Sequence, residues 1–299
     1  MLCFPLVALA AATPADAAPV DLVPPVLDQA ASPSAQSDTF RLTSRVYANT
    51  RLVRVLLPPG YDDPANRGVA YPLIVFTDGV AAFDDRGWGV PAVADSLWRA
   101  GALRAAILVG VDNGGSTSTS NNPAVDRAAE YLPYPDPSWT DAPKPVPRGD
   151  RFPAFLFTEV IPAISARYRV SSRSEDLGLA GASFGAVAAL YTVLEQPGRI
   201  GMLLLESPSL HVGRGVLLTR TGRATILPGR IHLGFGDREG DSESARSAMT
   251  ASALRLAGIL RRAAGVHLHL VEDPVGEHWF DAWRSRLAPA LVHLLNGTG

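Results

Sequence analysis

A serine at a sharp turn is the clearest chemical feature of this chain. The apolar run Leu177-Gly178-Leu179-Ala180 leads into Gly181-Ala182-Ser183-Phe184-Gly185, and residues 186–191 have helical character. Glycines two residues before and after Ser183 allow a strand and a helix to approach closely, which leaves the serine strained and exposed. The Phe184 N–H would then lie at the helix N-terminus, where it can stabilise an oxyanion. The pattern predicts a nucleophilic serine; the alternative is an ordinary turn that starts a helix.

A serine nucleophile needs a base, and the base needs a carboxylate to orient it. Where a serine occupies such a turn, the order along the chain is serine, acid, histidine. Of the six histidines, His278 follows the last predicted strand in a turn-rich loop and precedes the final helix. It is the predicted base, and a helix-capping histidine is the alternative. His267 and His269 alternate along one strand, but no carboxylate spacing supports a metal site there, so we predict neither metal nor organic cofactor.

The acid is expected in the loop that follows the strand at 230–235. Asp237 is closest to the end of this strand and is the first choice. Glu239 is the second choice, whereas Asp241 suits the N-terminus of the following helix. A solvated acidic turn is the alternative for the whole loop.

A second oxyanion donor is expected after an earlier central strand. The strand at 71–77 is followed by Asp78-Gly79-Val80, where Gly79 allows a sharp reversal of the chain. The amide of Gly79 or of Val80 could then face Ser183, and such a donor contributes roughly a hundredfold or more in rate. Asp78 either braces this loop or is a plain turn carboxylate.

The elements that must position these residues alternate between strands and helices. Short apolar runs at 71–77, 105–111, 202–206, 230–235 and 266–271 predict buried strands, and 51–57 predicts a half-exposed edge strand. Helices are predicted at 90–102, 152–168 and 242–264. This alternation predicts an α/β fold with one doubly wound, mostly parallel sheet in a single domain.

Composition limits the classes of partner. The chain has 299 residues, 47% of them hydrophobic and 19% charged, with a net charge of −2 and no dense basic run. These values predict a sizeable core and argue against a nucleic-acid or anionic-membrane partner. The sequence leaves the oligomeric state open.

The N-terminal region predicts export. Residues 1–18 form a short apolar segment with the small-residue pattern Ala15-Asp16-Ala17, too short to span a membrane, and they resemble a signal peptide without its usual basic residue. Residues 19–39 are predicted to be a flexible linker and 40–299 the catalytic domain. The only cysteine, Cys3, would leave with the signal. We therefore expect a periplasmic or secreted protein.

Several motifs together resemble the esterase D-like family, known as Putative esterase, of the α/β-hydrolases. The motifs are Asp78-Gly79 with Phe83-Asp84, Gly87-Trp88-Gly89-Val90, Val109 to Asn113, the turn around Ser183, Ser207 to Leu210, and Gly276 to Phe280 with Trp283-Arg284. The family includes feruloyl, acetyl-xylan and siderophore esterases and mycolyltransferases. The resemblance implies Ser183 as nucleophile, His278 as base, Asp237 as acid, and the amides of Phe184 and the Gly79 region as oxyanion hole. Some siderophore esterases resemble a Ser–His dyad, which leaves the acid open.

The substrate side is predicted from the long loop at 113–150. Its aromatic residues and Trp88 would suit a phenolic acyl group or a sugar face. Arg127, Tyr131 and Ser209 are further candidate substrate-binding residues. We expect a serine ester hydrolase that acts on a feruloyl or acetyl polysaccharide ester or on a siderophore ester. An acyltransferase and a non-catalytic binding protein of the same fold are the alternatives.

Overall fold

Eight strands of residues 34–297, the part of the chain that the computed structural model describes, form one sheet. The spatial order is β1-β2-β4-β3-β5-β6-β7-β8. The strands are β1 (Gln36–Ser44), β2 (Asn49–Leu57), β3 (Leu73–Phe76), β4 (Ile107–Val111), β5 (Leu177–Ala182), β6 (Met202–Glu206), β7 (Arg230–Gly236) and β8 (His267–Asp273). The pairs β1–β2 and β2–β4 are antiparallel, and all later pairs are parallel. This arrangement confirms the predicted doubly wound α/β sheet.

The edge of the sheet differs from the prediction. The strand predicted at 51–57 is not an edge strand, because β1 pairs with β2 along its whole length. The alternation of polar and apolar residues in β2 reflects one face that is only partly covered. β1 begins at Gln36, within the predicted linker, whereas the predicted signal peptide and the linker up to residue 33 lie outside the described residues.

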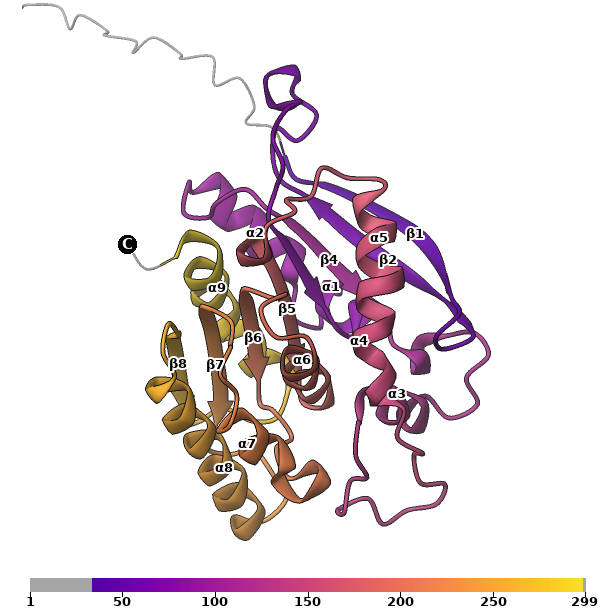
Figure 1. The fold of residues 1–299 in the computed structure, drawn as a ribbon, viewed down its shortest axis with the longest axis vertical. Coiled ribbons are helices and arrows are strands. Elements are labelled where there is room, and N and C mark those ends of the chain that lie inside the picture. Colours follow the sequence, from indigo (N-terminus) through magenta and orange to yellow (C-terminus); the bar gives the residue numbers. More distant parts are fainter. Residues whose placement is uncertain (1–33, 298–299) are drawn as a thin grey trace, which may run out of the picture. The chain divides into compact units, whose positions relative to one another are not determined.

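Helices cover both faces of the sheet (Figure 1). One face packs against α1 (Gly79–Phe83), α2 (Val90–Arg99) and α9 (Phe280–Asn296). The other face carries α3 (Pro123–Tyr131), α4 (Phe152–Phe155), α5 (Ile161–Ser165), α6 (Phe184–Glu195), α7 (Val216–Thr221) and α8 (Glu243–Arg262). None of the helices in residues 34–297 is long and apolar enough to cross a membrane.

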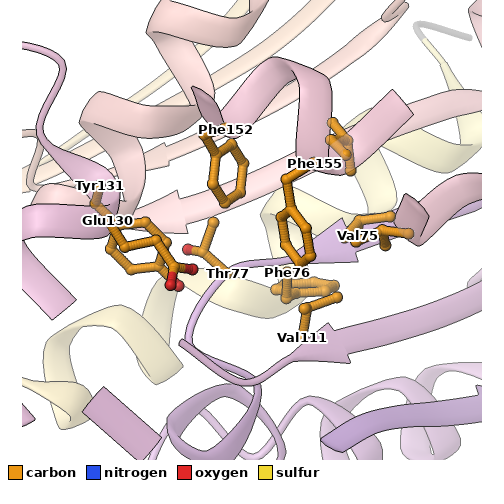
Figure 2. A pocket seen from close by; sticks show the side chains of 10 residues that line it. Val75, Phe76, Thr77, Val111, Glu130, Tyr131, Phe152 and Phe155 are labelled. Carbon is orange, nitrogen blue, oxygen red and sulfur yellow. The ribbon is translucent and has the colours of Figure 1, made fainter. Parts of the chain in front are cut away.

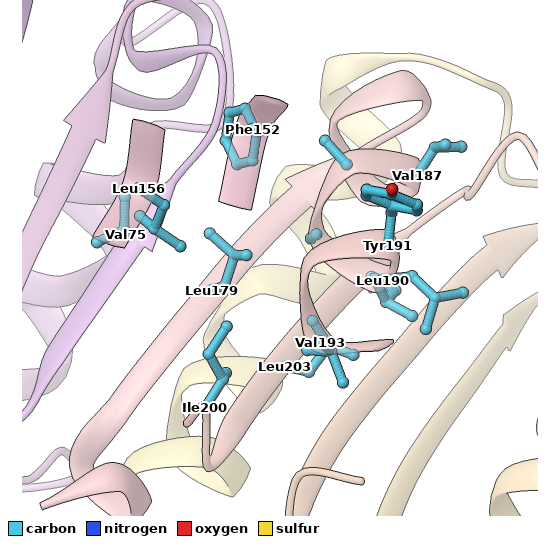
Figure 3. Close-up of a cluster of buried hydrophobic side chains, with 14 of the residues drawn as sticks. Val75, Phe152, Leu156, Leu179, Val187, Leu190, Tyr191, Val193, Ile200 and Leu203 are labelled. Carbon is cyan, nitrogen blue, oxygen red and sulfur yellow. The ribbon is translucent and has the colours of Figure 1, made fainter. Parts of the chain in front are cut away.

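The core explains why the central strands are apolar on both faces. Every residue of β3 and β6 is buried. On one face, Leu179 and Leu203 of the sheet lie against Val187 and Leu190 of α6 (Figure 3). Each such side chain contributes roughly 1.5–3 kcal/mol when it is fully buried. The strand that precedes Ser183 and the helix that follows it are therefore anchored in the core, which gives the turn between them a rigid base.

Candidate active site

Ser183 occupies the turn between β5 and α6 in a strained backbone conformation. Its φ is 56° and its ψ is −122°, and its N–H donates to the carbonyl oxygen of Glu206 at 2.9 Å. A Cβ on Gly181 would lie 2.4 Å from the backbone of Gly185, and a Cβ on Gly185 would lie 2.3 Å from Oγ1 of Thr77. Both glycines are therefore required by close approach, as the spacing predicts. The Oγ of Ser183 lies 3.4 Å from the Oγ of Ser209.

His278 lies in the loop between β8 and α9 and is paired with Glu239. Its Nδ1 is 3.0 Å from Oε2 of Glu239, and its side chain is partly exposed while that of Glu239 is buried. The other oxygen of Glu239, Oε1, accepts from the Gly236 N–H at 2.7 Å and from the hydroxyl of Ser207. Three contacts thus fix the carboxylate. With Nδ1 held by Glu239, Nε2 is the ring nitrogen left to meet a substrate or a serine hydroxyl.

The structure places Asp237, the first choice for the acid, in a different hollow from His278. The Asp237 N–H donates to the carbonyl oxygen of Asp273 at 2.9 Å, so its backbone continues the pairing of β7 with β8. Its side chain lines a hollow beside Glu243, Arg246 and Glu272, away from His278. Asp237 and Arg238 form the turn that follows β7, and this turn brings the Glu239 carboxylate back to the Gly236 N–H at the end of the strand. The second choice, Glu239, is the residue that contacts His278.

Ser183 and His278 share one cavity at the carboxyl ends of the central strands. Its volume is about 380 Å³. Three tryptophans and a phenylalanine contribute to one part of its wall, and polar side chains contribute to another. The lining residues are Asp78, Val80, Ala81, Trp88, Asn113, Ser116, Arg127, Ala182, Ser183, His278, Trp279, Phe280 and Trp283.

The expected oxyanion donors lie at two helix starts. Phe184 is the first residue of α6, and Gly79 and Val80 open α1, so these amides have no partner within their own helices. The left-handed residue of the second turn is Asp78, with a φ of 55°, rather than Gly79. Gly79 is needed for a different reason, because a Cβ there would lie 2.6 Å from the backbone of Gly110.

Asp112 lies behind this second turn. Burial raises the pKa of the Asp112 carboxyl, whereas Arg54 and the Val80 backbone N–H, which faces the carboxyl, act in the opposite direction. The Val80 amide therefore has a protein partner close by, and the prediction that it faces Ser183 remains a prediction. The amide of Phe184 is next to the nucleophile by its position in the chain.

Three of the four predicted substrate-binding residues lie in or beside the cavity. Trp88 and Arg127 line the cavity. Ser209 is buried beside Ser183. Tyr131 does not line the cavity: it is buried, and its hydroxyl accepts the Asp78 N–H at 2.9 Å. Figure 2 shows Tyr131 and Glu130 beside Thr77 at a small space of about 10 Å³ on the core side.

The long loop at 113–150 contains the helix α3, which was not predicted from the sequence. Asn122 caps this helix, and Arg127, Glu130 and Tyr131 lie on it. Outside α3, Trp139 stacks on Phe184 with ring centroids 6.5 Å apart. At least one aromatic residue of the loop therefore packs the loop down against α6.

Further residues at the site were not among the predicted site residues. Asn113 donates from Nδ2 to Oδ1 of Asp78, and Trp279, Phe280 and Trp283 line the cavity. The signal for the three aromatic residues was their position within the five residues that follow His278. Within the described residues, no group of three or more histidine, cysteine, aspartate or glutamate side chains is arranged to hold a metal ion.

The fold, with its mostly parallel eight-stranded sheet, matches that of α/β serine hydrolase structures. The Putative esterase family matches residues 44–294, and the chain belongs to this family. Among solved structures, the chain is similar to an IroE-like serine hydrolase from Shewanella oneidensis, with 20% identity, 87% and 80% of the two chains covered, and a TM-score of 0.69. It is also similar to a ferulic acid esterase, with 19% identity, 88% of this chain and 98% of the other covered, and a TM-score of 0.64. A third similar structure is the siderophore hydrolase EstB from Aspergillus nidulans, with 21% identity, 87% and 95% of the two chains covered, and a TM-score of 0.66.

Proposed function

We propose that the protein hydrolyses carboxylic esters with Ser183 as nucleophile, His278 as general base and Glu239 as the orienting acid. The observation that carries the proposal is that Ser183 and His278 line the same cavity while Glu239 holds Nδ1 of His278. As Oγ of Ser183 attacks the ester carbonyl, His278 takes the proton of the serine hydroxyl. The proton then passes to the departing alcohol, and an acyl-enzyme forms.

The second half of the cycle uses the same groups. A water molecule, deprotonated by His278, attacks the acyl-enzyme carbonyl, and Ser183 leaves with the proton that His278 returns. In both halves the carbonyl oxygen becomes negative. The amide of Phe184 at the start of α6 is suited to stabilise this charge, with a second donor from the Gly79–Val80 turn.

The wall of the cavity favours an aromatic group on the ester. Trp88, Phe280 and Trp283 offer ring surfaces to a planar acyl or alcohol part. Arg127 is the cationic side chain of the lining, and Asp78 pairs with it through two contacts of 2.8 Å. A highly charged ferric siderophore would therefore meet little uncompensated positive charge here. We favour a neutral feruloyl or acetyl ester, which would also fit the export predicted from residues 1–18.

The test is hydrolysis of p-nitrophenyl acetate by the purified protein beside Ser183→Ala. We expect turnover in the wild type, its loss in Ser183→Ala, and no change in Ser172→Ala, an exposed serine outside the cavity. Diethyl p-nitrophenyl phosphate should label the peptide that contains Ser183. An inert and unlabelled wild type, or full activity in Ser183→Ala, would overturn the proposal. If the wild type is active, the kcat/KM values for methyl ferulate and for a catecholate siderophore would be compared next.

A further inference from the structure

Ser207 has a backbone conformation that favours glycine. It directly follows β6 with a φ of 45°. Two other polar residues at the ends of neighbouring strands share this feature: Asp78 after β3 with a φ of 55° and Ser183 after β5 with a φ of 56°. Glycine would adopt such a φ at less cost, and strain of this kind indicates that the side chain has a role.

The hydroxyl of Ser207 has two partners, and together they fix the direction of its proton. The Nε1–H of Trp283 donates to Oγ of Ser207 at 2.8 Å, and the same Oγ contacts Oε1 of Glu239. An indole N–H can only donate, so Ser207 must accept from Trp283 and is free to donate to Glu239. Ser207 is 1% exposed, so water does not compete with these bonds.

Trp283 also contacts His278, the hydrogen-bond partner of Glu239. Its ring meets the ring of His278 edge to face, with centroids 5.3 Å apart and an angle of 85° between the planes. One indole therefore packs against His278 and, through Ser207, orients a hydrogen bond to Glu239. Movement of Trp283 would disturb both partners of the 3.0 Å contact between Nδ1 and Oε2.

We propose that Ser207 and Trp283 are positioning residues that keep the Glu239 carboxylate and the His278 ring aligned for the hydrogen bond between them. This inference rests on the proposed function for its effect on catalysis, but the geometry it describes can be tested without turnover. The Ser207 hydroxyl shares part of the negative charge of Glu239. Without that bond, more of the charge is directed at His278, which favours the protonated imidazole.

The test compares Ser207→Ala, Ser207→Gly and Trp283→Phe. For all three we expect kcat to fall about tenfold, with KM changed less than about threefold; the two Ser207 variants, which lose the hydroxyl, should also displace the acid limb of the pH–rate profile upward. Ser207→Gly should melt no lower than Ser207→Ala, because glycine accepts the φ of this position. If the two residues had only a structural role, the loss of kcat in each variant would instead parallel its loss of melting temperature. The double variant Ser207→Ala with Trp283→Phe should lose less than the two single losses combined, because Trp283 acts in part through Ser207.

Ala48→Gly is the matched control, because Ala48 has a φ of 53° in the turn between β1 and β2, away from the cavity. It should leave kcat and the pH profile unchanged. NMR titration of the His278 ring protons provides a readout that does not need turnover. An inert wild type with a displaced His278 titration in Ser207→Ala would contradict the proposed function alone. An unchanged titration in both Ser207→Ala and Trp283→Phe would overturn the positioning role.

Discussion

Arg127 holds both carboxylate oxygens of Asp78 at the wall of the cavity. Its Nε lies 2.8 Å from Oδ1 and its Nη2 lies 2.8 Å from Oδ2. Burial disfavours the guanidinium charge, but the Asp78 carboxylate outweighs this effect and raises the pKa of Arg127 above its ordinary value. The pair connects α3 to the left-handed turn at Asp78, which leads directly into Gly79 and Val80. The geometry of this turn therefore depends on a residue that is distant in sequence.

Arg127→Lys should lower kcat/KM of p-nitrophenyl acetate hydrolysis about tenfold. A lysine keeps the charge but cannot bind both oxygens of Asp78, so the turn that carries the second expected oxyanion donor would be less well fixed. Steady-state kinetics measure the effect. Arg86→Lys is the control, because Arg86 pairs with Asp84 at an exposed position and this exchange should be silent. Equal activity of Arg127→Lys and wild type would contradict the role given to the pair.

Glu239→Gln should reduce kcat by about a hundredfold or more, because the amide cannot stabilise the imidazolium that forms on His278. Asp237→Asn should stay within about twofold of the wild type, since Asp237 lines a different hollow beside α8. The comparison uses kcat for p-nitrophenyl acetate, with circular dichroism to confirm folding of both variants. The reverse result would show that Asp237 is the acid despite its position.

The sequence predicted the features that depend on local spacing and on the order of elements. The two glycines around Ser183 stand where a Cβ would collide with neighbouring atoms, and such collisions are encoded in the local pattern. His278 follows from topology, because the loop after the last strand must open at the same edge of the sheet as the loop after β5. These predictions needed no knowledge of long-range contacts.

The choice between Asp237 and Glu239 could not be made from local pattern. It depends on where β7 stops pairing with β8, and β8 is about thirty residues further along the chain, at His267–Asp273. The Asp237 N–H bonds to the carbonyl oxygen of Asp273 and its side chain lines another hollow, whereas Glu239 contacts His278. The burial of Tyr131 could not be predicted for a similar reason, because the nine-residue helix α3 that carries it was not predicted.

The melting temperature should fall as the pH is lowered from 8 to 5, partly through two histidines on β8 and α9. The ring centroids of His269 and His293 are 5.4 Å apart, and Nδ1 of His269 is 2.9 Å from Nδ1 of His232. Burial lowers the pKa of His269 and of His293 below the ordinary value of 6.5, and the neighbouring histidines lower the pKa of His269 further. The unfolded chain therefore binds protons at a higher pH than the folded chain does.

The sign of the effect follows from this difference. Because the unfolded state gains the protons first, stability is fully present above about pH 6.5 and is lost as the pH falls toward the lower folded-state pKa values. Replacing His269 with glutamine removes one of these groups, so His269→Gln should lose less melting temperature between pH 7 and pH 5 than the wild type does. Calorimetry or circular dichroism melts at a fixed ionic strength measure the slope. His211→Gln, on the opposite side of the sheet from α9 and at the rim of another cavity, is the control and should keep the wild-type slope. Identical slopes in wild type and His269→Gln would assign the acid sensitivity to other groups.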